Sequence, residues 1–183
     1  MRKVTWIMLG IASIAAVAVA GCSSDDSSTP SGNTSSGGTT GTLYERLGKK
    51  DGIAKAVDAI VQEELKDPEI ASYFFFQTTA AAGHPTPAQI EECLTNQLGA
   101  AAGGPEKYPT TVSGGFTCRS MVATHAKLGI PNGVFDKFVT IAAGVLKTAG
   151  VADADITTVG GVLVGTKGDV VTDTTRDGGA FKQ

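Results

Sequence analysis

Two histidines and three cysteines are the side chains of this 183-residue sequence best suited to bind a metal or to form a covalent link. The spacing of Met121, His125 and Leu128 predicts a short helix with all three residues on its apolar face. A histidine in that position either makes a hydrogen bond in the core or binds a metal or cofactor. His84 lies far from His125 in a segment of glycine and proline, and no H-E-x-x-H or clustered-cysteine pattern indicates zinc.

The first 22 residues have the pattern of an export signal. Arg2 and Lys3 precede an apolar, alanine-rich run that ends in Val-Ala-Gly before Cys22. This pattern resembles the bacterial lipoprotein signal, in which the cysteine becomes the lipid-bearing first residue. We therefore expect residues 1–21 to be removed and Cys22 to anchor the chain to a membrane of the cell envelope, facing the periplasm or the exterior. An uncleaved N-terminal anchor with an incidental cysteine is the alternative.

The composition then divides the rest of the chain. Residues 23–41 are almost all Ser, Thr, Gly, Asp and Asn, so with Cys22 they are expected to form a lipidated, flexible tether (22–41). Residues 42–171 are long enough for one globular domain. The chain is polar from Gly168 onward, and we expect the tail, residues 172–183, to be frayed. The net charge of −3 supplies no basic patch, so nucleic acid is not expected as a partner.

Cys93 and Cys118 remain as a pair once Cys22 is assigned to the signal. In an exported chain a disulfide is the default expectation. Two buried free thiols or a redox pair are the alternatives.

Hydrophobic periodicity predicts an all-α domain. One helix is expected from Asp51 as its N-cap to the stop at Asp67-Pro68, and another starts near Pro87, after the N-cap Thr86 and with Gln89 as capping-box partner. A short helix from Met121 is expected to end at Gly129, a longer one to run from Pro131 to Gly150, and a last one from Asp153 to Val171. No convincing β-hairpin signal or internal repeat is present.

The order of several short motifs resembles the truncated haemoglobins, and specifically their first group. These motifs are Thr42–Gly48 (T-L-Y-E-R-L-G), Leu65–Pro68 (L-K-D-P), Tyr73-Phe74, Gly103–Tyr108 (G-G-P-E-K-Y), Arg119–Met121 and His125–Ile130 (H-A-K-L-G-I). Together they cover nearly the whole of the predicted domain. The resemblance implies a two-over-two helical sandwich around haem b.

The resemblance also assigns roles to individual residues. His125 would be the proximal ligand of the haem iron, which leaves the sixth position open to oxygen, nitric oxide or carbon monoxide. Phe74 would stack on the haem, although Phe75 and Phe76 follow and could shift the register by one. Tyr108 and Met121 would lie at the haem edge and on the proximal wall.

The distal side is expected to depart from the family. Val61 stands where the family usually has a tyrosine, so a hydroxyl donor is missing. Thr86 and Gln89 match positions near the distal site and are candidates to replace the missing donor. Compared with the family, about three residues are also inserted around Gly99–Ala102. Phe138 would make the distal pocket apolar or tight, and His84 is either an exposed loop residue or a sixth iron ligand. The segment between Tyr108 and Met121 is longer than in the family, and a Cys93–Cys118 bond would clamp it onto the pocket wall.

Two function classes follow from these residues. The first is a haem protein outside the cytoplasm that binds oxygen or another diatomic gas, with nitric oxide detoxification or electron transfer as further roles. Nitric oxide dioxygenation would require a separate reductase, because the chain has no flavin or nicotinamide domain. The second class is a lipid-anchored structural or interaction domain that keeps the helical outline but has lost haem.

Overall fold

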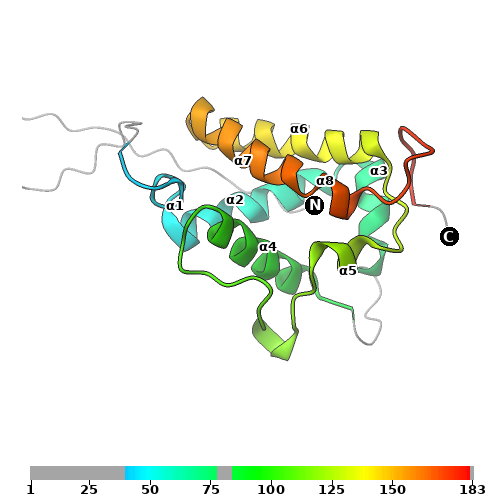
Figure 1. The fold of residues 1–183 in the computed structure, drawn as a ribbon, viewed down its shortest axis with the longest axis horizontal. Helices are drawn as coiled ribbons and strands as arrows, with labels where there is room; N and C mark the ends of the chain where they lie inside the picture. Colours follow the sequence, from blue (N-terminus) through cyan, green and yellow to red (C-terminus); the bar gives the residue numbers. More distant parts are fainter. Residues whose placement is uncertain (1–39, 78–83, 182–183) are drawn as a thin grey trace, which may run out of the picture. The chain divides into compact units, whose positions relative to one another are not determined.

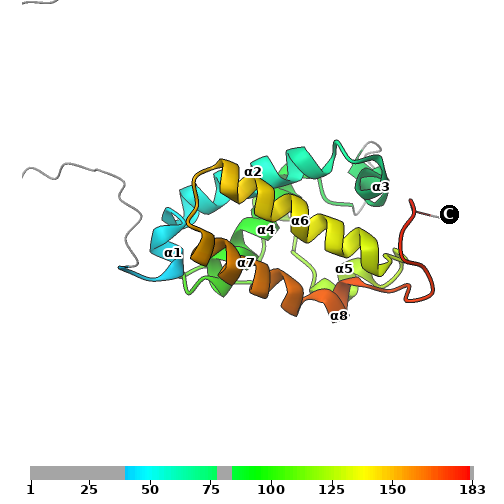
Figure 2. The ribbon, with the colours of Figure 1, turned by 90° about the horizontal axis from the view of Figure 1, so that it is seen from above.

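The regular elements of the computed structural model are all helical over residues 40–77 and 84–181, which are the residues that the structure describes. Its four longest helices are α2 (Lys49–Glu64), α4 (Pro87–Ala101), α6 (Asn132–Thr148) and α7 (Asp153–Gly165). α2 packs against α4 and α6, and α6 packs against α7. The α6–α7 pair lies above the α2–α4 pair in Figure 1, and Figure 2 shows α2, α6 and α7 from above. The predicted all-α, two-over-two arrangement is confirmed.

The first long helix begins earlier than the sequence predicted. The short helix α1 (Leu43–Arg46) is closed by a capping box between Thr42 and Glu45, and α2 then starts after Gly48, which has a left-handed φ of 82°. Asp51 lies inside the first turn of α2 and is not its N-cap. A Cβ on Gly52 would lie 2.1 Å from the carbonyl oxygen of Leu47, so glycine allows the turn after α1 to pack closely against α2.

The second long helix begins as predicted. The Thr86 side chain accepts a hydrogen bond from the backbone N–H of Gln89, and the Gln89 side chain accepts one from the backbone N–H of Thr86. Pro87 occupies the first turn, where no intrahelical partner is needed for its nitrogen. α4 then continues without a break to Ala101, through most of the stretch where an insertion was expected.

The later helices follow the predicted order but differ in their ends. α5 covers Met121–His125 with Ser120 as its N-cap, so it stops before the expected end at Gly129. α6 ends with Ala149 as C-cap and Gly150 at a φ of 80°, close to the prediction. The last predicted helix is two helices, α7 and α8 (Lys167–Val170), which meet at Thr166.

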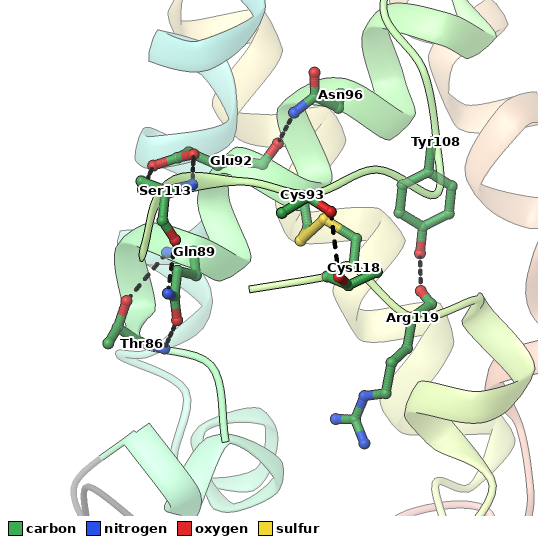
Figure 3. The surroundings of a disulfide bond; sticks show 11 residues. Thr86, Gln89, Glu92, Cys93, Asn96, Tyr108, Ser113, Cys118 and Arg119 are labelled. Atoms are coloured by element: carbon green, nitrogen blue, oxygen red, sulfur yellow. Dashed lines mark hydrogen bonds between the residues drawn. A yellow bond between two sulfur atoms is a disulfide. The ribbon is translucent and has the colours of Figure 1, made fainter. Parts of the chain in front are cut away.

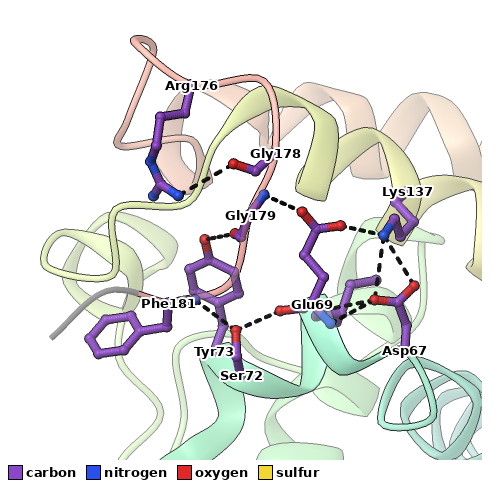
Figure 4. A network of polar contacts seen from close by, with 10 residues as sticks. Asp67, Glu69, Ser72, Tyr73, Lys137, Arg176, Gly178, Gly179 and Phe181 are labelled. Atoms are coloured by element: carbon purple, nitrogen blue, oxygen red, sulfur yellow. Dashed lines mark hydrogen bonds and ion pairs between the residues drawn. The ribbon is translucent and has the colours of Figure 1, made fainter.

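The C-terminal tail is ordered through Phe181, which corrects the expectation that it is frayed. The Tyr73 hydroxyl donates a hydrogen bond of 2.8 Å to the carbonyl of Gly179, and the Phe181 ring packs edge-on against Tyr73 (Figure 4). The backbone N–H of Gly179 donates to Glu69, which also pairs with Lys137. Glu69 lies in the short helix α3 (Pro68–Ala71), and Tyr73 lies in η1 (Ser72–Gln77). The tail therefore packs against these two short helices.

The signal sequence, Cys22 and nearly all of the tether lie outside the described residues. Within residues 40–77 and 84–181, no helix has the length and apolar character needed to cross a membrane.

The core has two clusters of buried apolar side chains. The first joins α2, α4, α6 and α7 and includes Ile53, Val57, Val61, Leu98, Ala142, Leu146 and Val159. The second joins α3, η1, α6 and α8 and includes Ile70, Tyr73, Ile130, Val134, Phe135 and Val170. Members of both clusters line one cavity, which is the candidate site.

Candidate functional site

A cavity of about 610 Å³ lies among α2, α4, α5, α6 and α7. Its walls are mostly apolar, and they include Val57, Ile60, Val61, Ile90, Leu94, Leu98, Leu128, Phe135, Phe138, Val159 and Leu163. This volume falls in the range of ligand-binding cavities, which are typically apolar with a few polar groups that orient the ligand. The polar groups of this cavity therefore decide what it can bind.

His125 contributes an imidazole ring to this wall. It lies at the end of α5, and its Nδ1 is 2.8 Å from the carbonyl oxygen of Met121 one turn earlier. A carbonyl can only accept, so Nδ1 carries the proton and Nε2 keeps its lone pair. Burial lowers the pKa of His125, which favours the neutral ring at neutral pH. A neutral imidazole oriented through Nδ1 is the usual state of a metal-ligating histidine.

The other residues expected beside His125 also line the cavity. Phe74 and Met121 contribute to its wall, as does Tyr108. The Tyr108 hydroxyl donates a hydrogen bond of 2.6 Å to the carbonyl of Arg119, which holds the ring against the segment that leads into α5. Burial raises the pKa of Tyr108. The structure thus brings the four residues that were predicted to bind the cofactor to one cavity.

The opposite wall differs in part from the prediction. Val61 and Phe138 line the cavity as expected, so the position of Val61 supplies no hydroxyl group. Thr86 and Gln89 do not line it. They are used in the capping box of α4, and the Gln89 side chain also donates to the carbonyl of Ser113.

The face of α4 that reaches the cavity begins one residue later than the capping box. It consists of Ile90, Cys93, Leu94, Gln97 and Leu98. These residues recur at helical spacing, so the periodicity of α4 was the signal that would have identified them. Gln97 is the polar member of this face, and the other members are apolar, in place of the candidate donors Thr86 and Gln89.

The predicted disulfide is confirmed. Cys93 of α4 and Cys118 are joined by an S–S bond, and Cys118 is only 2% exposed. Figure 3 shows how this bond and the contacts of Ser113 hold the segment between Tyr108 and Cys118 against α4. The backbone N–H of Ser113 donates a 3.0 Å hydrogen bond to Glu92, and Cys93 itself lines the cavity. The long segment before α5 is therefore fixed to the cavity wall.

Glu64 is the residue that sequence reasoning missed. It lies at the end of α2, is 1% exposed and lines the cavity. Its Oε1 has no hydrogen-bond partner among the residues described. Burial raises its pKa to about 8, so the acid form is favoured at neutral pH. Its spacing in the sequence could have identified it as buried, because Glu64 continues the buried face of α2 formed by Val57, Ile60 and Val61.

His84 also contributes to the cavity wall and is an exposed residue. The sequence left two roles open for His84, an exposed loop residue or a sixth iron ligand, and the second of these stays a prediction. No group of three or more His, Cys, Asp or Glu side chains that could hold a bare metal ion occurs in the described part of the chain.

The fold is similar to those of solved truncated haemoglobins. The truncated hemoglobin from Tetrahymena pyriformis in its Fe(III) form superposes with a TM-score of 0.58 at 26% sequence identity, covering 72% of this chain and 98% of that chain. The 2/2 hemoglobin from Synechococcus sp. PCC 7002, solved in the cyanomet state with covalently attached heme, gives the same TM-score and coverage at 24% identity. The sequence matches no protein-family model and no curated protein.

Proposed function

We propose that this protein is a truncated globin of the first group that binds haem b in the cavity and reversibly binds oxygen or another diatomic gas. The observation that carries the proposal is the state of His125. Its Nδ1 proton is held by the Met121 carbonyl, and its ring lies in the wall of an apolar cavity with Nε2 available. Similarity to haemoglobin structures, whose chains align over 72% of this chain and 98% of their own length, supports this function.

The lining of the cavity fits a mainly apolar cofactor that is held through one nitrogen ligand. Its polar wall groups are few, and His125 is the residue that would hold the iron. Phe74 and Met121 would pack on the macrocycle, and Tyr108 would lie at its edge. A bound haem would supply an iron able to bind a diatomic gas.

The residues of α2 and α4 shape the space left for that gas. Val61, Ile90 and Leu94 present apolar side chains, which favour small, weakly polar ligands. Phe138 from α6 adds an aromatic wall. These side chains favour oxygen, nitric oxide and carbon monoxide over charged ligands, because a charge is costly to transfer into such a cavity.

Absorption spectroscopy tests the proposal. The protein produced with haem available should show an intense Soret band that shifts when the protein is reduced and exposed to carbon monoxide. His125→Ala should lose this band or shift it strongly, whereas His84→Ala is the matched histidine control and should retain it. A folded parent protein that takes up no haem would exclude gas binding and leave the helical scaffold as the function.

The proposal places the globin domain outside the cytoplasm, anchored through a lipid on Cys22. The support is the sequence pattern of residues 1–22 and the disulfide, which is typical of oxidising compartments. Cell fractionation tests it: the wild-type chain should partition with membranes, and Cys22→Ser should prevent lipidation. Nitric oxide detoxification or electron transfer in that location would require a separate reductase.

A further inference from the structure

Glu64 is a buried acid in the wall of the apolar cavity. It lies on α2 three residues after Val61, and both residues line the cavity. The two side chains therefore share one face of the helix. The Oε1 atom of Glu64 is buried without a hydrogen-bond partner among the described residues.

Among the described residues, no neighbouring charge stabilises the ionised form of this carboxyl group. Burial alone raises the pKa of Glu64, with no contribution from a hydrogen bond or an ion pair. The charged side chains on the helices packed against α2 interact with groups other than Glu64. On α1, Arg46 pairs with Asp155, and Glu45 accepts a hydrogen bond from Thr42. On α4, Glu92 accepts a hydrogen bond from Ser113, and Glu91 lies near the like charge of Asp58. On α6, Lys137 pairs with Asp67 and Glu69, Asp136 with Lys167, and Lys147 with Asp153.

Other titratable groups line the same cavity without pairing with Glu64 in the described residues. They are Tyr73, His84, Tyr108, Arg119, His125 and Lys127. Tyr73, Tyr108 and His125 each have a specified backbone partner, Gly179, Arg119 and Met121 respectively. Glu64 has no partner of this kind, so its carboxyl group keeps an unused hydrogen-bonding capacity in the wall of the cavity.

We propose that Glu64 donates a hydrogen bond from its carboxylic acid proton to the small ligand bound in the cavity, and so takes the place of the hydroxyl donor that is missing at Val61. This inference rests on the proposed gas-binding function. The ligand class is a small neutral molecule with an acceptor atom, such as dioxygen. A protonated carboxyl group is both a donor and an acceptor, and an apolar site keeps it in the neutral form that can donate.

The identity of the donor can be tested in the haem-loaded protein with carbon monoxide as the probe. The infrared carbon–oxygen stretching band reports hydrogen bonding to the bound probe, because donation to its oxygen lowers the frequency. Four proteins are compared: the wild type, Glu64→Gln, Glu64→Leu and the control Gln97→Leu. Gln97 lines the same cavity from α4 but does not titrate.

The inference predicts a low-frequency band in the wild type and in Gln97→Leu, and a higher-frequency band in Glu64→Leu. In the wild type, which requires no substitution, the low-frequency band should be lost as the pH rises through about 8. Glu64→Gln should remove this titration while its amide still donates. Oxygen should also leave reduced Glu64→Leu about 5- to 150-fold faster, as expected for the loss of one buried hydrogen bond.

The outcomes separate the two proposals. Haem uptake with the same band in wild type and Glu64→Leu, or a wild-type band that is independent of pH, would overturn the role of Glu64 and leave gas binding intact. A band that moves in Gln97→Leu and not in Glu64→Leu would assign the donor to Gln97 and overturn the role of Glu64. A wild-type protein that takes up no haem would overturn the proposed function and the role of Glu64 with it.

Discussion

The buried carboxyl group of Glu64 should make the stability of the protein depend on pH. Burial raises its pKa from 4.5 to about 8, so the folded protein holds this proton more tightly than the unfolded chain. The contribution of Glu64 to stability is therefore full below pH 4.5 and is lost as the pH rises through about 8. At about 1.4 kcal/mol per pH unit, the interval from 4.5 to about 8 corresponds to about 5 kcal/mol.

Glu64→Gln removes this dependence because an amide does not titrate. Urea unfolding of both proteins between pH 4 and pH 9 measures the free energy of unfolding at each pH. The stability of the variant minus that of the wild type should rise by about 5 kcal/mol across this range. The variant should be favoured most strongly above pH 8, where the wild type must bury a charge.

Glu63→Gln is the matched control, since Glu63 is the preceding residue of α2 and forms an exposed ion pair with Lys66. It should change the stability by no more than about 1 kcal/mol at any pH. Parallel curves of stability against pH for wild type and Glu64→Gln would refute the argument that Glu64 is buried as an acid without a partner.

Three further predictions concern the contacts that support the cavity. Replacing Cys93 and Cys118 by serine should lower the free energy of unfolding by about 3–4 kcal/mol, for a sequence separation of 25 residues. The same change should speed haem loss, and equal loss rates for oxidised and reduced protein would contradict the clamp. Thr86→Ala should lower the free energy of unfolding, measured by thermal unfolding, by about 1 kcal/mol, because Thr86 caps α4. The absorption spectra of the protein with bound gases should not change, since Thr86 does not line the cavity. Tyr73→Phe should cost about 1 kcal/mol and expose the tail to proteolysis, because it removes the hydrogen bond to Gly179; unchanged proteolysis would argue against docking of the tail.

Helix positions were predictable where the signals are local. Thr86 and Gln89 form a capping box within four residues, with Pro87 in the first turn, and the structure has that box and the helix that follows it. The start of α2 was misassigned because its first turn is set by the left-handed Gly48 and the close approach of α1 to Gly52. Asp51 has the side chain of an N-cap, but this tertiary contact moves the helix start before it.

The site was predictable on the side of His125 and less so on the opposite side. His125 and Met121 are four residues apart, so their contact follows from one helical turn. The distal residues depend on the register between α4 and the rest of the domain, and Thr86 and Gln89 were placed from approximate spacing. Successive side chains point in different directions around α4, and those of Ile90 and Leu94, rather than those of Thr86 and Gln89, line the cavity.

Long-range contacts explain the remaining differences. The tail was expected to fray because it is polar, yet Gly179 and Phe181 dock on Tyr73, more than one hundred residues earlier in the chain. Glu64 was overlooked because a glutamate usually lies on a solvated face. Its position on the buried stripe of α2 is evident only when its spacing from Val57 and Val61 is weighted above its charge.

The central claim is that Nε2 of His125 holds a haem iron inside the cavity. The most direct test is a haem titration of the wild type and of His125→Gly, each with and without added imidazole. We predict one haem bound tightly by the wild type, weak or altered binding by the variant, and recovery of the wild-type spectrum when imidazole fills the space left by the side chain. Identical titrations and spectra for the two proteins would contradict the claim.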